Sequence, residues 1–216
     1  IRRGFSTNFH IKFITMFWIN HLDYAKAGTT LKKIYNRISG PNQKIDNILM
    51  VHSLRPHTLT GHMALYKNVI HNSNNTLPKW YLEALGIYVS FLNKCDYCVD
   101  HHFAGLKRLW NDEKKSEDFL DAMKKNRLQD FFEDHWFKGM SYANMLTLNP
   151  KKLSHNDIEH LREANFSDGE ILEINQVVSY FCYANRTVLG LGVHSDGDIL
   201  GLSPNNSEDH DNWSHQ

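Results

Sequence analysis

Residues 78–110 constrain the fold of this chain more than any other stretch. Apolar side chains recur at helical spacing over residues 78–92 and again over residues 95–110. Asn93 and Lys94 interrupt the pattern between the two runs. The sequence therefore predicts two consecutive helices joined by a short turn.

Two of the three cysteines lie at the start of the second predicted helix. Cys95, Cys98 and His102 are spaced i, i+3 and i+7, so they share one face of that helix. Unpaired backbone N–H groups and the helix dipole favour a thiolate at a helix N-terminus, and His102 is a nearby base. Two thiols at this spacing can also close into a disulfide after one is oxidised. Glu83, on the preceding helix, is placed to orient His102 or to accept its proton.

Two other interpretations of the cysteine pair remain open. Cysteine often acts as a small buried hydrophobic residue. The pair together with His101 or His102 also supplies ligands suited to zinc, but structural zinc needs four ligands. The sequence contains neither a second Cys-x-x-Cys nor a histidine pair at zinc-finger spacing. We expect His101 to face away from the thiols and to be solvated or packed.

The spacing Glu-x11-Cys-x2-Cys-x3-His resembles the core motif of the AhpD-like alkylhydroperoxidases, within the carboxymuconolactone decarboxylase superfamily. Glu83, Cys95, Cys98 and His102 match its four positions. The text around these residues, and residues 180–193 downstream, look like the peroxidase-related branch. The likeness runs from about residue 18 to residue 193.

The resemblance implies an all-α fold, a compact bundle of about seven to nine helices, and a thiol-dependent peroxidase. It implies that Cys98 attacks a hydroperoxide, that Cys95 resolves the sulfenic acid, and that His102 and Glu83 relay protons. An external thiol reductant of a lipoyl or thioredoxin type and a homo-oligomer, trimer or hexamer, are also implied. Tyr97 departs from the AhpD pattern, which has a relay histidine at that position.

The remaining sequence also favours helices. Helical spacing and Pro or Gly breaks predict helices over residues 23–38, 45–53, 58–71, 119–126, 128–149, 154–164 and 167–189. Ser167 and Glu170 form a capping box at the start of the last of these helices, and Gly190-Leu-Gly192 ends it. Residues 111–118 read as a charged connection. The bulky apolar side chains of residues 128–149 are expected in the core or at a subunit interface. Cys182 is expected in the core, and Asn185 and Arg186 match the family without an assigned chemical role.

Three segments make up the expected organisation. Residues 1–17 read as an N-terminal extension, 18–202 as the AhpD-like helical domain and 203–216 as a flexible polar tail. Residues 9–19 are the only stretch with useful strand-like spacing. His210 and His215 are expected to be solvated in the tail.

Four histidines, at positions 52, 57, 62 and 71, cluster in sequence. Their spacing of five, five and nine does not place them on one helical face, so a metal site there is disfavoured. One histidine lining the thiol pocket is the better expectation. His57, which follows Pro56, is the candidate.

Composition narrows the function further. Lys plus Arg equals Asp plus Glu, 24 each, so no basic field invites nucleic acid, and no run of 18 apolar residues predicts a membrane span. Three cysteines do not make a disulfide framework; they suit a reducing, cytoplasmic setting. No cofactor and no metal is expected. The alternatives are a non-catalytic redox-sensing or zinc-binding helical oligomer, and a lactone decarboxylase, against which the Cys-x-x-Cys argues.

Overall fold

A computed structural model describes residues 17–204 and 213–216 of the chain. The only β-type pairing among these residues is one bridge between Pro204 and His215, so the expected all-α class is confirmed. The helices are α1 (Thr29–Ile38), α2 (Asn47–Met50), α3 (Pro56–Ile70), α4 (Lys79–Leu92), α5 (Asp96–Trp110), α6 (Glu113–Lys124), α7 (Leu128–Phe131), α8 (Asp134–Leu148), α9 (His155–Glu163) and α10 (Asp168–Leu191). Two 3₁₀ turns, η1 (Pro41–Gln43) and η2 (Pro150–Lys152), complete the list.

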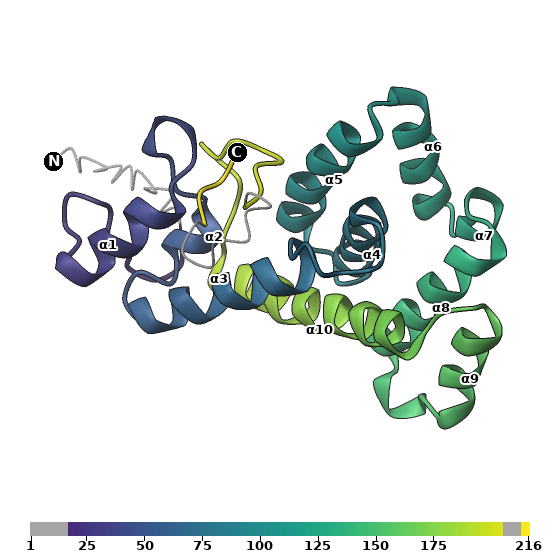
Figure 1. Ribbon diagram of the computed structural model, residues 1–216. Coiled ribbons are helices and arrows are strands. Elements are labelled where there is room, and N and C mark those ends of the chain that lie inside the picture. Colours follow the sequence, from purple (N-terminus) through teal and green to yellow (C-terminus); the bar gives the residue numbers. More distant parts are fainter. Residues whose placement is uncertain (1–16, 205–212) are drawn as a thin grey trace, which may run out of the picture.

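Helix α4 is the centre of the bundle. Figure 1 shows it end-on, with α5 to α8 and α10 around it, and it packs directly against α5, α8 and α10. Every residue from Tyr81 to Ser90 is buried, as expected for a helix covered on all sides. Glu83 is the only acidic residue in that buried stretch.

The close approach of α4 and α10 depends on Gly86. A Cβ built at Gly86 would lie only 2.0 Å from the Phe181 ring, well inside contact distance. The fully buried Phe181 packs in turn edge-on against His102, with ring centroids 4.6 Å apart. The glycine therefore lets α10 press an aromatic ring against α5.

The first helix is shorter than expected. The predicted start at Asp23 is wrong, because the Asp23 carboxylate accepts the backbone N–H of Lys26 at 2.9 Å and folds residues 23–27 into a turn. Local bonds of this kind compete with helix formation. The expected helix over residues 45–53 is likewise reduced to α2 and the turn that follows it.

Two further boundaries differ from expectation. Residues 111–118 are not a connection, because Asp112 caps the N-terminus of α6 by accepting the Lys115 N–H at 2.9 Å. The helix expected over residues 128–149 is split into α7 and α8, since Phe132 adopts an extended conformation and packs against Trp80 and Phe119. The bulky side chains of this region are core residues, as expected.

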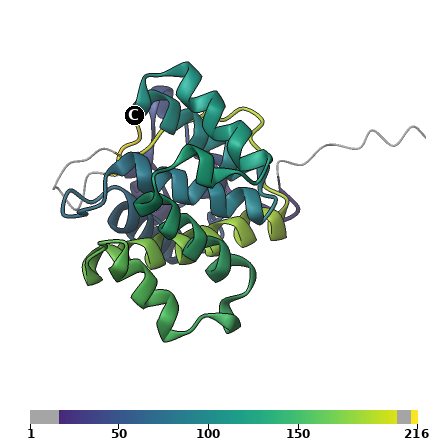
Figure 2. The ribbon, with the colours of Figure 1, turned by 90° about the vertical axis from the view of Figure 1, so that its right-hand side faces the viewer.

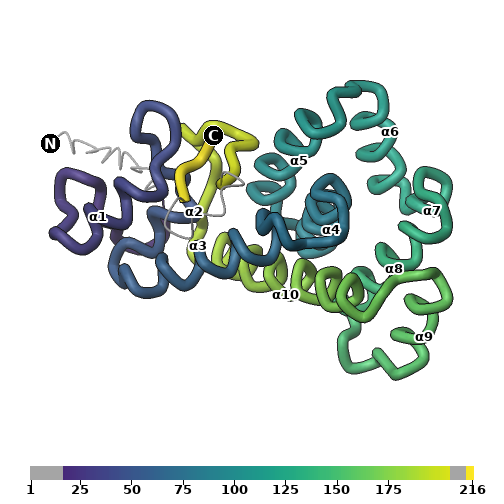
Figure 3. Tube along the Cα trace, viewed as in Figure 1, coloured from purple at the N-terminus to yellow at the C-terminus, as the bar shows by residue number. Residues whose placement is uncertain are grey.

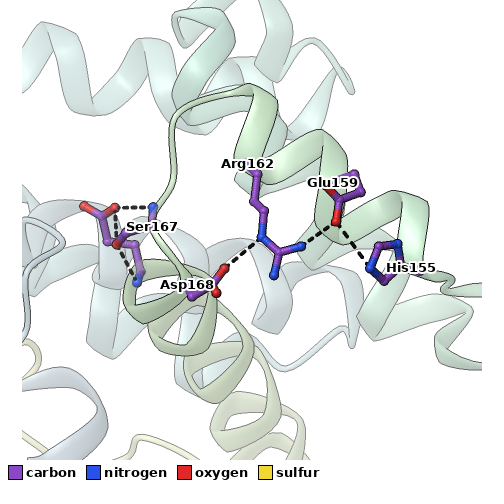
Figure 4. Close-up of polar contacts among 6 residues, drawn as sticks. His155, Glu159, Arg162, Ser167 and Asp168 are labelled. Atoms are coloured by element: carbon purple, nitrogen blue, oxygen red, sulfur yellow. Dashed lines mark hydrogen bonds and ion pairs between the residues drawn. The ribbon is translucent and has the colours of Figure 1, made fainter.

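The connection between α9 and α10 is built from capping groups and one ion-pair chain. Ser154 and Ser167 each open a helix with a capping box, and the box at Ser167 was expected from the sequence. Figure 4 shows Arg162 between Glu159 and Asp168, joining the two helices; its Nε lies 2.8 Å from the Asp168 carboxylate. In the turned view of Figure 2, α9 lies at the lower end of the molecule.

The chain after α10 returns to the other end of the bundle. Gly192 ends α10 in the left-handed conformation (φ +63°), as the Gly-x-Gly sequence predicted. The segment from residue 193 to residue 204 then passes between α2 and α5, and residues 213–216 lie beside it (Figures 1 and 3). We call residues 193–204 the strap.

Candidate functional site

The turn between α4 and α5 places both thiols. Lys94 takes a left-handed conformation (φ +58°), and the Cys95 N–H donates to the Ser90 carbonyl at 2.9 Å. Cys95 is therefore the N-cap residue of α5, and Cys98 lies in its first turn. The two sulfur atoms are 3.2 Å apart, within hydrogen-bonding distance, and both cysteines are free thiols.

The thiol with the lower pKa is not the thiol that a ligand in the cavity can reach. The hydrogen bond with Cys98 lowers the pKa of Cys95. The same interaction, together with burial, raises the pKa of Cys98. Cys98, however, lines the cavity described below, whereas Cys95 is fully buried behind it. A ligand in the cavity can therefore reach Cys98 while the first proton is lost more readily at Cys95.

Glu83 and His102 form a buried hydrogen-bonded pair. His102 Nδ1 lies 2.7 Å from a Glu83 carboxylate oxygen, which links α5 to α4. The other Glu83 oxygen lies 3.9 Å from Nε2 of His71. Burial holds the pKa of His71 well below its usual range, so that this imidazole is neutral. All four residues of the sequence motif thus lie at the junction of α4 and α5.

Asn185 is a site residue that the sequence did not assign. It is fully buried on α10, accepts a hydrogen bond from Asn93 at 2.9 Å and donates one to the Ser90 hydroxyl at 3.0 Å. The Asn185 side chain also favours the ionised forms of the two thiols. The sequence feature that could have identified Asn185 is the pair of polar residues, Asn185 and Arg186, within an otherwise apolar predicted helix. Arg186 is exposed and bonds its own helix at the Cys182 carbonyl.

A cavity of about 270 Å³ lies in front of Cys98. Its walls come from α2, α3, α4, α5, α10, the strap and the last residues of the chain. Cys98, Glu83 and His102 all line it, together with apolar side chains and the aromatic rings of Tyr66 and Tyr180. These two rings are stacked, with centroids 5.5 Å apart. The lining therefore combines apolar and aromatic surface with many polar and titratable side chains, and a concave space with convergent polar groups is the default candidate for a small-molecule site.

Asp198 fastens the strap over this cavity. Its carboxylate accepts the Asn47 backbone N–H at 3.0 Å and the Tyr97 hydroxyl at 2.8 Å, and lies 3.4 Å from His101 Nε2. The side chain of Asn47 adds a bond to the His194 carbonyl at 2.8 Å. Tyr97, which stands where AhpD has a relay histidine, is therefore an anchor for the strap.

Three histidine expectations are wrong. His101 is packed, which was one of the two expected states, since it is buried and stacks on Tyr97; it does not face away, because it lines the cavity. His57 is exposed at the start of α3 and lies outside the cavity, which takes His62 instead, one turn further along that helix. His215 is not solvated; it is buried, and its Nδ1 lies 2.9 Å from the Ile38 carbonyl.

The described residues also bear on the metal interpretation. Within residues 17–204 and 213–216, no three His, Cys, Asp or Glu side chains are arranged to hold a metal ion. The rings of His52 and His62 are tilted by 39° to each other with centroids 5.0 Å apart, while His71 lies beside Glu83. In the same ranges, no helix combines the length and the apolar character that crossing a bilayer requires. His210 and the strand-like stretch before residue 17 lie outside the described residues.

The fold matches solved AhpD-type structures, although no protein-family model and no curated protein matches the sequence. An uncharacterized peroxidase-related protein from Ralstonia eutropha JMP134, described as an alkylhydroperoxidase AhpD core, has a TM-score of 0.71 at 18% identity over 85% of this chain and 94% of that one. A peroxidase-related protein from Silicibacter sp. TM1040 has a TM-score of 0.64 at 22% identity over 73% and 82%. The debrominase Bmp8 with 2,3,4-tribromopyrrole has a TM-score of 0.64 at 14% identity over 83% and 91%. The AhpD-like fold expected from the motif is therefore confirmed.

Proposed function

We propose that this protein is a thiol-dependent peroxidase that reduces organic hydroperoxides or hydrogen peroxide. The observation that carries the proposal is the cavity that exposes Cys98 beside the Glu83–His102 pair, with the Cys95 sulfur 3.2 Å behind. Such a site combines a nucleophile, a base that a third group orients, and a second thiol. The AhpD-like fold supports the same chemistry by analogy.

The proposed reaction has three balanced steps. The Cys98 sulfur attacks the outer peroxide oxygen, the O–O bond breaks, and the alcohol leaves as the sulfenic acid forms. Cys95 then attacks the Cys98 sulfur, which releases water and forms the Cys95–Cys98 disulfide. An external dithiol of a lipoyl or thioredoxin type takes the disulfide back to two thiols and is itself oxidised. His102, held by Glu83, takes the thiol proton in the first step.

Cys98 is the proposed nucleophile even though the pKa of Cys95 is the lower one. The reacting oxygen must reach the sulfur, and only Cys98 lines the cavity. His102, which Glu83 holds, takes the Cys98 proton, so attack by Cys98 does not require prior ionisation of Cys95. Low acidity at Cys98 also leaves a more nucleophilic sulfur once its proton has gone.

Thiol counting tests the proposal. One equivalent of an organic hydroperoxide is expected to consume two thiols, and mass spectrometry should find a Cys95–Cys98 linkage that a dithiol reverses. Cys98→Ser should abolish turnover, whereas Cys95→Ser should allow one oxidation and no recycling. Cys182→Ser, the third cysteine, is the matched control and should turn over normally. Unchanged thiols while peroxide persists, or full activity in Cys98→Ser, would contradict the proposal.

A second candidate function is reductive dehalogenation by the same dithiol. The structural likeness to a debrominase and the stacked Tyr66–Tyr180 wall of the cavity favour it. In this reaction an aromatic carbon–halogen bond is replaced by carbon–hydrogen, a halide leaves, and the two thiols become a disulfide. Release of bromide from 2,3,4-tribromopyrrole with loss of two thiols, and no reaction with peroxides, would select this function.

The proposed function also includes an oligomeric state and a cellular compartment. We expect a homo-oligomer, trimer or hexamer, and a reducing compartment such as the cytoplasm, which would keep both thiols reduced between turnovers. Light scattering at several protein concentrations measures the assembly directly. A monomer at all concentrations would contradict that expectation and leave the thiol chemistry untouched.

A further inference from the structure

Asp46 is a buried carboxyl group in the cavity that the proposed reaction has not yet used. It is the N-cap residue of α2 and is 7% exposed. No side chain or backbone group in residues 17–204 and 213–216 hydrogen-bonds its carboxyl oxygens. It nevertheless lines the same cavity as Cys98 and His102. The carboxyl oxygens are not among the enclosed, unpaired polar atoms of the described residues, so they open onto the cavity, where a bound ligand can exchange a proton with them.

Asp198, a second carboxyl group nearby, is surrounded by hydrogen-bond donors, whereas Asp46 is not. Asp198 accepts two hydrogen bonds and lies beside His101, as suits a carboxylate. The burial of Asp46 and, second, the negative field of Asp198 raise the pKa of Asp46 to about 6. Neighbouring carboxyl groups whose surroundings separate them in this way divide into an acid and a charge stabiliser in known active sites.

The other groups that face Asp46 do not reverse this. His101, Lys44 and His102 lower its pKa in part, but burial and Asp198 outweigh them. The cavity is also lined by the titratable side chains of His62, Tyr66, Lys79, Glu83, Tyr97, Cys98, Arg108, Tyr180 and His215. Asp46 thus keeps a proton at mildly acidic pH.

We propose that Asp46 is the general acid of this site, which protonates the alkoxide that leaves when Cys98 cleaves a hydroperoxide. The inference rests on the proposed peroxidase function and deepens it. As the sulfur–oxygen bond forms and the O–O bond breaks, the electron pair goes to the leaving oxygen, and the Asp46 proton goes with it to give the alcohol. The Cys98 proton goes to the His102–Glu83 base, and Asp46 is reprotonated from solvent. The acid comes from α2 and the base from α4 and α5, so each group can act separately.

Substrates that differ in their leaving group test the assignment. An alkoxide from tert-butyl hydroperoxide needs a proton, whereas the acetate that leaves peroxyacetic acid does not. With Asp46→Asn we expect kcat/KM for tert-butyl hydroperoxide to fall about 10²-fold, the usual worth of a general acid, and that for peroxyacetic acid to change little. Asp46→Glu should restore part of the loss. An equal fall with both substrates, or no fall with either, would overturn the proposal.

The pH profile supplies a second readout. In the wild type, the ratio of the tert-butyl hydroperoxide rate to the peroxyacetic acid rate should fall about tenfold per pH unit above the pKa of Asp46. In Asp46→Asn the ratio should be flat with pH. A wild-type rate ratio that does not fall as the pH rises above the pKa of Asp46 would contradict its role as the general acid.

Two measurements separate this inference from the proposed function. Alkylation of Cys98 by iodoacetamide reports an intact cavity and has no peroxide leaving group, so Asp46→Asn should leave its rate unchanged. A rate that falls with the peroxide rate would assign Asp46 a structural role and reject the acid. If the wild type reduces neither peroxide, the peroxidase function fails and the inference fails with it; if it reduces both and the variant shows no leaving-group dependence, only the inference fails.

Discussion

Asn185 shows how one buried amide holds the dithiol. Its side chain bonds Ser90 and Asn93 and favours the thiolates of Cys95 and Cys98. Asn185→Ala should therefore move the midpoint of thiol alkylation to higher pH, because a donor to the ionised sulfur is lost. It should also lower the free energy of unfolding by about 1–3 kcal/mol, since the buried Ser90 hydroxyl loses its donor and the Asn93 amide loses its oxygen acceptor.

The control for that prediction is the next residue. Arg186 is exposed and bonds only within its own helix. Arg186→Ala should leave the alkylation midpoint where it is in the wild type. A midpoint that does not move in Asn185→Ala, measured by alkylation rate against pH, would remove Asn185 from the thiol environment.

At this scale, the sequence predicts residues that lie close together along the chain. Glu83, Cys95, Cys98 and His102 lie within twenty residues, on two helices whose turn was visible, and the structure brings them together. Asp46 lines the cavity, Asn185 neighbours the thiols and Asp198 anchors the strap, each from an element far from the thiols in sequence. Helical spacing in the sequence does not indicate which helices pack together in the fold, so no sequence pattern could have grouped these three residues with the thiols.

Helix α4 can lie against α10 only because Gly86 has no side chain. Gly86→Ala would drive a Cβ into the buried Phe181 ring, and overpacking of this kind costs about 1–3 kcal/mol. Because Phe181 packs on His102, peroxide turnover should fall together with stability. Urea denaturation and a turnover assay measure the two effects.

Gly190 is the matched control, since it lies in α10 with nothing within 4 Å of an added Cβ. Gly190→Ala should be neutral or should stabilise the protein by up to about 1 kcal/mol, because alanine favours helix more than glycine does. A similar loss in both variants would point to the glycines as such and away from the α4–α10 contact.

The strap is held largely through one carboxylate. Asp198→Ala leaves the Asn47 N–H and the Tyr97 hydroxyl without their acceptor, so we expect a loss of about 1–3 kcal/mol. The cavity wall should loosen, and Cys98 should react faster with iodoacetamide. Asp196, exposed on the same strap, provides the control. An unchanged alkylation rate in Asp198→Ala would show that the strap does not restrict access.

Helices with clear start and stop residues were predictable from the sequence, and elements whose bounds depend on a single side-chain interaction were not. Pro78, the Ser167 capping box and Gly192 mark the limits of α4 and α10 within a few residues. The late start of α1 follows from one carboxylate–backbone bond at Asp23. The strap has no periodic pattern, and its course follows from hydrogen bonds to α2 and α5.

The whole molecule should lose stability on mild acidification. Burial lowers the pKa of His62 to about 3 and that of His215 to about 4. Below pH 6.5 the unfolded chain binds protons at these two histidines and the native state does not, so the free energy of unfolding decreases as the pH is lowered. His62 alone contributes on the order of 5 kcal/mol over that range. Asp46 acts in the opposite sense, since its raised pKa makes folding less favourable as pH rises from about 4 to about 6 by only about 3 kcal/mol.

Unfolding free energies measured by urea from about pH 7 to about pH 4 check this prediction. His62→Phe should give a shallower fall, because it removes the larger titration. His155→Gln, a change to an exposed histidine, should leave the slope unaltered. A slope that is the same in His62→Phe and the wild type would mean that His62 is protonated in the native state.

The order in which the chain is made gives the strap a further consequence. Asp198 follows Cys98 by 100 residues in the sequence. At roughly 5–20 residues per second, a ribosome adds it on the order of 5–20 s after the thiol. During synthesis the dithiol therefore exists before the part of the cavity wall that the strap supplies. The restriction on access to Cys98 that the Asp198→Ala variant tests would be acquired only when the strap docks.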